Sequence, residues 1–436
     1  MKKRALILSY YFPPSGGSGV QRWMFFSRYL NEFGIEPVVV TVKPEEASYK
    51  FLDNTLLDKV SHVKVKRTST MEPLGLYAKI RGGEKSEHIP QGFAGESNPT
   101  FFQKLSRMIR GNVFLPDARK GWNLYAIAEA RKIISTSKVD VIISTGPPHS
   151  THLAGMKLKA EFRLPWIADF RDPWTEVYYN KMLYRSSWAN ERDRKMEKEV
   201  LEKCDVVLTV GPGMASSLES KLPFEMRGKV KYIYNGYDEE VFTGIQKLHH
   251  PDKFVICHTG ILSENQPIDA FLDSMHALLE KIPALRSQVQ MQFVGKVSPS
   301  ILEKAEKVFG QDHLQVTGYV PHSLAVQYMM NADLLLNSFA ETADASVLVS
   351  GKLMEYLASG NPMLGLGDPN GDAAKLMSGS EQTRIFSRAD KAGISGFIEK
   401  IYFHKINGQG FAPADFSKYS RKNSTALLAS LIDSLI

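Results

Sequence analysis

The chain has 436 residues, which is too long for one ordinary hydrophobic core and favours two domains of about 200 residues each. With 43% hydrophobic and 23% charged residues, its composition excludes a fibrous or largely disordered protein. The net charge of +7 is uneven: residues 1–240 carry 37 Lys and Arg against 28 Asp and Glu, and the remainder carries 17 against 19. A basic first half suits nucleic acid, an anionic membrane or a phosphorylated substrate equally well.

Short apolar runs alternate with longer amphipathic stretches along the chain, which predicts doubly wound α/β sheets with parallel strands covered on both faces. We expect strands at 5–11, 37–42, 139–145, 165–170, 205–210 and 230–235, and a second series at 253–260, 289–295, 314–320, 332–338 and 362–367. We expect helices between them, including 19–33, 122–137, 150–161, 188–203, 267–281 and 351–359.

The series restarts after a polar stretch without periodicity, so we predict a first domain over 1–240 and a second over 252–410. A last helical stretch, 417–436, is expected to cross back to the first domain. Residues 101–110 form a basic amphipathic pattern in which Phe101, Leu105, Met108 and Ile109 share one helical face. That face either packs on the core or lies on an anionic membrane surface.

Two cysteines, Cys204 and Cys257, lie in strand-like runs and predict buried thiols in an intracellular protein. The apolar run near the N-terminus is too short for a signal peptide, and no stretch of about 18 apolar residues occurs. We therefore expect a cytoplasmic protein. Neither the cysteines nor the histidines have the spacing of a zinc site.

The first predicted strand leads into YYFPPSGGSGVQRW, where Gly16, Gly17 and Gly19 precede a helix. Small residues at such a junction let the backbone approach a ligand, and a helix N-terminus favours an anion. The loop lacks the Gly-Lys-Ser/Thr of a Walker A motif and the spacing of a dinucleotide-binding motif. A plain tight turn is the alternative interpretation.

Polar side chains also follow two later strands of the first series. His149 and His152 lie in STGPPHSTH, where a cap, a surface role and hydrogen bonding in a substrate cleft remain open. Asp169, Arg171 and Asp172 follow the strand IADF. They form a local ion pair, or else an Asp orients an acceptor hydroxyl while Arg171 holds a phosphate or carboxylate.

In the second half, ASVLVSGKLMEYLASGNPML has Ser350 and Gly351 at a helix start. Lys352 and Glu355 then lie about one turn apart. The helix amides and Lys352 suit a diphosphate, and an ionised carboxylate at Glu355 suits the two hydroxyls of a ribose. An ordinary surface ion pair is the alternative interpretation.

Together these segments resemble the retaining glycosyltransferases of family 4, particularly those of bacterial surface-polysaccharide clusters. The resemblance covers almost the whole chain and is carried by YYFPPSGGSGVQR, NVFLPDARKGW, ISTGPPHSTHLAG, IADFRDPW, NGYD, HTG, FVG, TGYVPH and GKLMEYLASGNP. It implies a GT-B fold, in which two Rossmann-like domains face each other across a cleft. It also implies transfer of a hexose-like unit from a nucleotide-sugar to a saccharide or lipid-linked acceptor with retention of configuration.

The resemblance also implies roles for individual residues. Donor-binding residues would be Gly16, Gly17, Ser18, Gly19, Gly260, Gly318, Tyr319, Val320, Ser350, Gly351, Lys352 and Glu355, where Glu355 matches the second glutamate of the E-x7-E motif. Catalytic candidates are His149, Asp169 and Asp172, and Arg22 and Arg171 are candidates for the acceptor or a phosphate. Such enzymes act without an enzyme nucleophile, and the absence of an Asp-x-Asp motif predicts no metal and no other cofactor.

The chain departs from the family pattern at Val347, where the first motif glutamate would stand and meet the donor sugar. The segment after HTG also lacks the basic residue that is frequent in the family. A GT-B epimerase and a catalytically degenerate sugar-nucleotide binder are therefore the alternative functions. Dispersed basic residues without a recognised motif argue against nucleic acid.

Overall fold

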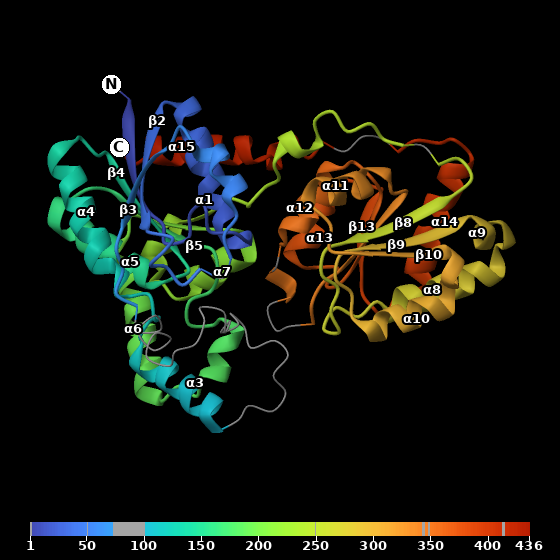
Figure 1. Ribbon diagram of the computed structural model, residues 1–436, viewed down its shortest axis with the longest axis horizontal. Helices are drawn as coiled ribbons and strands as arrows, with labels where there is room; N and C mark the ends of the chain where they lie inside the picture. Colours follow the sequence, from blue (N-terminus) through green and yellow to red (C-terminus); the bar gives the residue numbers. More distant parts are fainter. Residues whose placement is uncertain are drawn as a thin grey trace. The chain divides into compact units, whose positions relative to one another are not determined.

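The computed structural model describes residues 2–49, 51–72, 101–248, 250–341, 345–347, 349–411 and 415–436. Contacts divide the chain into two compact units, Met1–Asn235 with Lys422–Ile436, and Gly236–Arg421. Each unit has a parallel sheet with helices on both faces (Figure 1). The predicted pair of doubly wound α/β domains is confirmed.

Unit 1 contains a seven-stranded sheet in the order β3-β2-β1-β4-β5-β6-β7, and every described pair in it is parallel. Its strands are β1 (Lys3–Leu8), β2 (Ile35–Val42), β3 (Lys64–Thr68), β4 (Val141–Gly146), β5 (Trp166–Phe170), β6 (Val206–Thr209) and β7 (Val230–Tyr232). Its helices are α1 (Ser18–Tyr29), α3 (Phe101–Val113), α4 (Trp122–Thr136), α5 (Ser150–Phe162), α6 (Ser187–Lys203), α7 (Pro212–Ser220) and α15 (Arg421–Asp433), and the 3₁₀ turn η4 covers Tyr178–Leu183.

Two apolar layers stabilise this sheet, one on each face. One layer joins alternate strand residues to α4, α5, α6 and α7, and includes Trp122 and Trp166. The other joins the opposite residues to α1 and to Leu428 and Ile432 of α15. The last helix thus belongs to the first unit, and both chain ends lie together there, where Lys3 pairs with Asp433 at 2.8 Å (Figure 1).

Unit 2 contains a six-stranded parallel sheet in the order β10-β9-β8-β11-β12-β13. Its strands are β8 (Phe254–Thr259), β9 (Val289–Val294), β10 (Leu314–Gly318), β11 (Leu334–Ser338), β12 (Met363–Leu366) and β13 (Thr383–Phe386). Its helices are α8 (Asp269–Lys281), α9 (Pro283–Gln288), α10 (Pro299–Phe309), α11 (His322–Asn331), α12 (Gly351–Ala358), α13 (Asp372–Met377) and α14 (Lys391–Ile406), and η8 covers Ala345–Val347.

The sequence patterns missed two edge strands, β3 and β13. Along β3, KVKRT alternates exposed and more buried residues, because an edge strand has water on one side. Such a strand lacks the continuous apolar run by which the central parallel strands were recognised. β13, with the sequence TRIF, has an exposed arginine among its four residues and therefore also lacks a continuous apolar run.

Candidate functional site

Each sheet reverses its strand order once, and ligands of open α/β sheets bind beyond the carboxyl ends of the strands at such a point. In unit 1 the reversal lies between β1 and β4, and in unit 2 it lies between β8 and β11. The glycine loop follows β1, the STGPPH segment ends β4, and α12 is the first α-helix after β11. The motifs recognised in the sequence therefore lie at the two reversal points.

In the glycine loop, Gly16, Gly17 and Gly19 differ in backbone conformation and surroundings. Gly17 has φ 94° just before α1, a conformation that strongly favours glycine. A Cβ on Gly16 would lie 2.2 Å from the ring of Phe51, which is 55% exposed and has room to turn away. Ser18 and Gly19 are exposed at the N-terminus of α1, where free amides suit an anion.

Asp169 and Arg22 form a buried ion pair with 3.0 Å between Nη2 of Arg22 and Oδ1 of Asp169. Oδ2 of the same carboxylate accepts hydrogen bonds from Trp23 at 2.6 Å and Thr145 at 2.8 Å. Arg22 also donates to the Ile233 carbonyl at 2.7 Å. Both side chains are engaged inside unit 1, and the catalytic role of Asp169 and the phosphate role of Arg22 stay predictions.

Arg171 has a comparable structural use at the carboxyl edge of the sheet. Its guanidinium donates to the carbonyls of Gly19, Gly146 and Pro147, and the last two contacts measure 3.2 and 2.5 Å. It thereby ties the start of α1 to the segment after β4. Asp172, the next residue, is exposed at the same edge and keeps the catalytic role only as a prediction.

His149 and His152 are buried at the start of α5 and do not form a pair of metal ligands. Oγ of Ser144 is 2.9 Å from Nδ1 of His152, whose ring stacks on Phe170. Neither ring nitrogen of His149 forms a well-aligned hydrogen bond, although the side chain is only 7% exposed. Burial lowers the pKa of His149 well below its ordinary value, and nearby positive charge lowers it further, so the ring is neutral.

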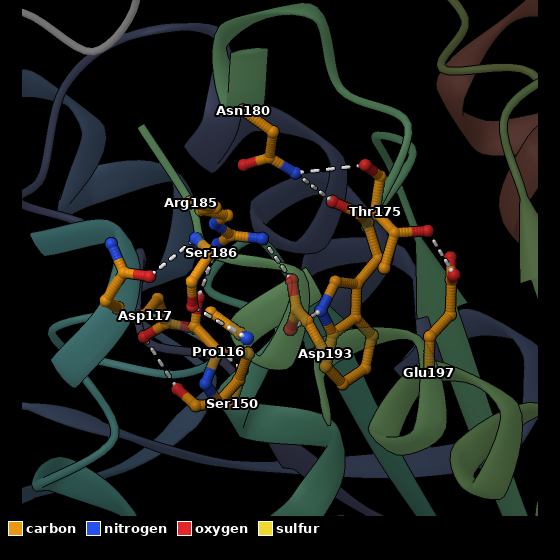
Figure 2. A network of polar contacts seen from close by, with 12 residues as sticks. Pro116, Asp117, Ser150, Thr175, Asn180, Arg185, Ser186, Asp193 and Glu197 are labelled. Atoms are coloured by element: carbon orange, nitrogen blue, oxygen red, sulfur yellow. Dashed lines mark hydrogen bonds and ion pairs between the residues drawn. The ribbon is translucent and has the colours of Figure 1, made fainter. Parts of the chain in front are cut away.

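A pocket lies beside His149, over the segments that follow β4 and β5. Its walls come from residues 110–119, 147–149 and 174–193, and they include Arg110, Arg119, Trp174, Asn180 and Arg185. Figure 2 shows the polar network around it, in which Asp117 caps the first turn of α5 and Asp193 meets Arg185. Apart from His149, sequence reasoning assigned no role in a pocket to these side chains, because they lie in two stretches far apart in the sequence, 110–119 and 174–193.

In unit 2, three glycines pack together beside the reversal point. Gly260, Gly295 and Gly318 all have positive φ, at 91°, 134° and 69°. A Cβ on Gly295 would lie 2.2 Å from the Gly260 carbonyl oxygen, so the backbones can meet only without side chains. Tyr319 is 91% exposed directly after Gly318, and Val320 is partly buried.

The N-terminus of α12 adjoins this glycine cluster. Ser350 caps the helix by accepting a hydrogen bond from the Leu353 amide at 3.3 Å. Nζ of Lys352 lies 3.3 Å from Nε2 of His258, whose Nδ1 is 2.9 Å from the Leu336 carbonyl. Burial lowers the pKa of Lys352 to about 8, against the opposing charge of Glu355. Burial and the nearby charge of Lys352 lower the pKa of His258 to about 3, so neutral His258 accepts a hydrogen bond from Lys352.

Glu355 lies one turn further along α12. Its Oε1 is 3.0 Å from Nε2 of His322, the first residue of α11. Val347 belongs to η8 and supplies no carboxylate. Within the described ranges, no three His, Cys, Asp or Glu side chains gather as a potential metal site, and no described helix has the length and hydrophobicity to cross a membrane.

Comparisons with known proteins agree with this architecture. Residues 84–241 match the family model Glycosyltransferase Family 4, and no curated protein matches the chain. Sucrose-phosphate synthase from Thermosynechococcus elongatus has a similar structure, with 14% identity, coverage of 99% of both chains and a TM-score of 0.56. A lipopolysaccharide outer core galactosyltransferase is 10% identical over 100% of both chains, with a TM-score of 0.57.

An epimerase is also among the similar structures. A putative UDP-N-acetylglucosamine 2-epimerase from Listeria monocytogenes is 12% identical over 100% of this chain and 96% of that one, with a TM-score of 0.51. At such identities the likeness shows the fold alone. The similar structures thus agree with the fold of two Rossmann-like units, and the family model matches the part of the chain from 84 to 241.

Proposed function

We propose that the protein transfers a sugar from a nucleotide-sugar to a saccharide or lipid-linked acceptor with retention of configuration. The observation that carries the proposal is the N-terminus of α12 beside the cluster of Gly260, Gly295 and Gly318 at the reversal point of the second sheet. A cationic side chain, free helix amides and close-packed backbone are the features that bind a diphosphate.

The chemistry rests on positioning and charge. Lys352 and the first amides of α12 would neutralise the departing diphosphate, which stabilises the transition state without an enzyme nucleophile. Glu355 would accept hydrogen bonds from the two ribose hydroxyls in place of its present contact with His322. Retention by attack on the face that the diphosphate leaves is a part of the proposal that needs a product analysis.

A sugar-nucleotide binder without transferase activity is the second candidate, and Val347 favours it. A carboxylate at this position would meet the donor sugar, whereas a Val side chain accepts no hydrogen bond. If the protein binds nucleotide-sugars but gives no product with a broad acceptor panel, the binder is the better description. A transferred sugar with unchanged anomeric configuration establishes the enzyme.

The first experiment is a thermal-shift screen of nucleoside diphosphates and nucleotide-sugars. A ligand that binds the native state raises the melting temperature by mass action. We expect one class of nucleotide to raise it for the native chain and to lose most of its effect with Glu355→Ala. The matched control is Glu303→Ala, at an exposed helix position of unit 2. No shift with any nucleotide would refute the proposal.

A membrane-facing acceptor is the finer part of the proposal. The α3 helix contacts the residue after η4, where Asn112 donates a hydrogen bond to the Tyr184 carbonyl at 3.0 Å. Exposed apolar side chains lie around this contact. Met108, Ile109, Val113 and Tyr184 are 43–67% exposed, and Trp188 of α6, 62% exposed, carries Arg192 over its ring. Exposed apolar side chains beside cations suit an anionic bilayer surface.

Sedimentation with liposomes tests this contact. Met108→Ser with Ile109→Ser should reduce binding to vesicles that contain anionic lipid, because two apolar side chains no longer enter the interface. Leu427→Ser is the matched control, since Leu427 is 57% exposed on α15. Equal sedimentation of both variants, or binding that ignores anionic lipid, would count against a membrane contact at α3.

A further inference from the structure

The pocket beside His149 contains buried polar atoms that the described residues satisfy poorly. Among these residues, neither ring nitrogen of His149 has a well-aligned partner, and none hydrogen-bonds to Nε of Arg119. Both residues line the same pocket. A buried polar group without a partner costs about 1–3 kcal/mol, so several in one pocket indicate a binding site that a ligand completes.

The acidic side chains of the pocket are already engaged. Asp117 accepts from the amide and the hydroxyl of Ser150, at 2.8 and 2.9 Å. Asp193 pairs with Arg185 and accepts from the Trp174 indole at 2.8 Å. Figure 2 shows both carboxylates turned toward these partners. Neither carboxylate is therefore available to bind a cation, and the hydrogen bonds that each accepts weaken its repulsion of an anion.

The Arg119 side chain lies over two aromatic rings. The Arg119 guanidinium lies 5.7 Å from the ring centre of Tyr10 and 5.6 Å from that of Tyr11. The nearby Glu72 carboxylate shares its charge with the Tyr10 hydroxyl, from which it accepts a hydrogen bond. Arg110 adds a second positive charge to the lining. Arg119 thus brings guanidinium donors to the pocket, which suits an acceptor-rich anion.

We propose that this pocket binds an anionic group of the acceptor, a phosphate or a carboxylate, through Arg119 and His149. That the anion belongs to a transferase acceptor rests on the proposed function. That the pocket binds an anion rests on the pocket alone. Trp174 adds an apolar wall, because its ring stacks on His149 at 5.1 Å and 11°. An anion held by Arg119 and a sugar or apolar group against this wall would fill the pocket together.

The test uses the full chain labelled with ¹⁵N-histidine and phenyl phosphate as the probe, and it follows the ring resonances by NMR. The resonance of His149 is assigned by its loss in His149→Asn. We expect it to shift saturably with phenyl phosphate and not with benzyl alcohol, which lacks the charge. The shift should survive Lys352→Ala, because the pocket belongs to unit 1.

Variants of Arg119 test the charge. Arg119→Gln should weaken phenyl phosphate binding about tenfold or more, the usual effect of losing a charge-assisted hydrogen bond, while Arg119→Lys should keep part of the affinity. Arg131→Gln is the matched control, since Arg131 is on an exposed face of α4 and pairs with Glu161. Thermal unfolding of each variant verifies that it is folded.

The outcomes separate this inference from the proposed function. An unresponsive His149, or unchanged affinity in Arg119→Gln, overturns the anion pocket even if nucleotides still raise the melting temperature. A responsive His149 without any nucleotide effect supports the pocket and removes only its link to a transferase acceptor. Hexose 6-phosphate and farnesyl phosphate then distinguish a water-soluble anion from a lipid-borne one, because the true source binds more tightly.

Discussion

The state of charge of Lys352 yields a prediction that depends directly on the proposed diphosphate site. With a pKa of about 8 in the free protein, Lys352 is about 90% charged at pH 7 and about 10% charged at pH 9. A bound diphosphate favours the charged amine and raises this pKa. Binding therefore takes up a proton near pH 8, and the affinity falls as the pH rises through that value.

The expected fall in the association constant between pH 7 and pH 9 is about tenfold, or about 1.4 kcal/mol. A lysine with an ordinary pKa near 10.4 would lose almost nothing over this range. Isothermal titration of a nucleoside diphosphate measures the affinity, and buffers of different ionisation enthalpy measure the proton uptake. Lys352→Arg is the control, because arginine stays charged and should give a flat profile. A flat profile for the native chain as well would refute the assignment of Lys352 to the diphosphate.

Three further changes test other parts of the structure. Asp169→Ala should lower the free energy of unfolding by about 3–5 kcal/mol, because Arg22 would remain buried without its partner. Asp433→Ala breaks the exposed pair with Lys3 and should lower it by less than about 1 kcal/mol. Urea unfolding measures both changes. In the same assay, Gly295→Ala should lower the free energy of unfolding by at least about 2 kcal/mol more than Gly310→Ala. Both glycines have positive φ, but of the two only Gly295 faces a backbone oxygen. Equal losses would contradict a steric requirement at Gly295. In the thermal-shift assay, the native chain should prefer a ribonucleoside diphosphate over its 2′-deoxy form by about 1–2 kcal/mol of binding free energy, and Glu355→Gln should reduce this preference. An unchanged preference in Glu355→Gln would contradict ribose binding by Glu355.

Much of the fold was predictable, because central parallel strands are apolar along their whole length and stand out from the polar segments between them. The positive φ of Gly17 was consistent with the predicted turn for a similar local reason. The use of Asp169 was not predictable, since its partners Arg22 and Thr145 come from different elements and only the folded sheet brings them together. Sequence alone located the strand end and offered only a local ion pair at this turn as the alternative, whereas the structure pairs Asp169 with Arg22 of α1.

The two reversal points differ in how freely their polar groups can exchange partners. In unit 1, Asp169 and Arg22 make several buried hydrogen bonds each, so any ligand that displaced them would leave buried charge unsatisfied. In unit 2, Lys352 and Glu355 contact the histidines His258 and His322 at 3.3 and 3.0 Å. A diphosphate is a better partner for Lys352 than the neutral imidazole of His258, and this exchange therefore costs little. By the same reasoning, we expect a ligand of unit 1 to bind at the pocket beside His149 and not at the ion pair.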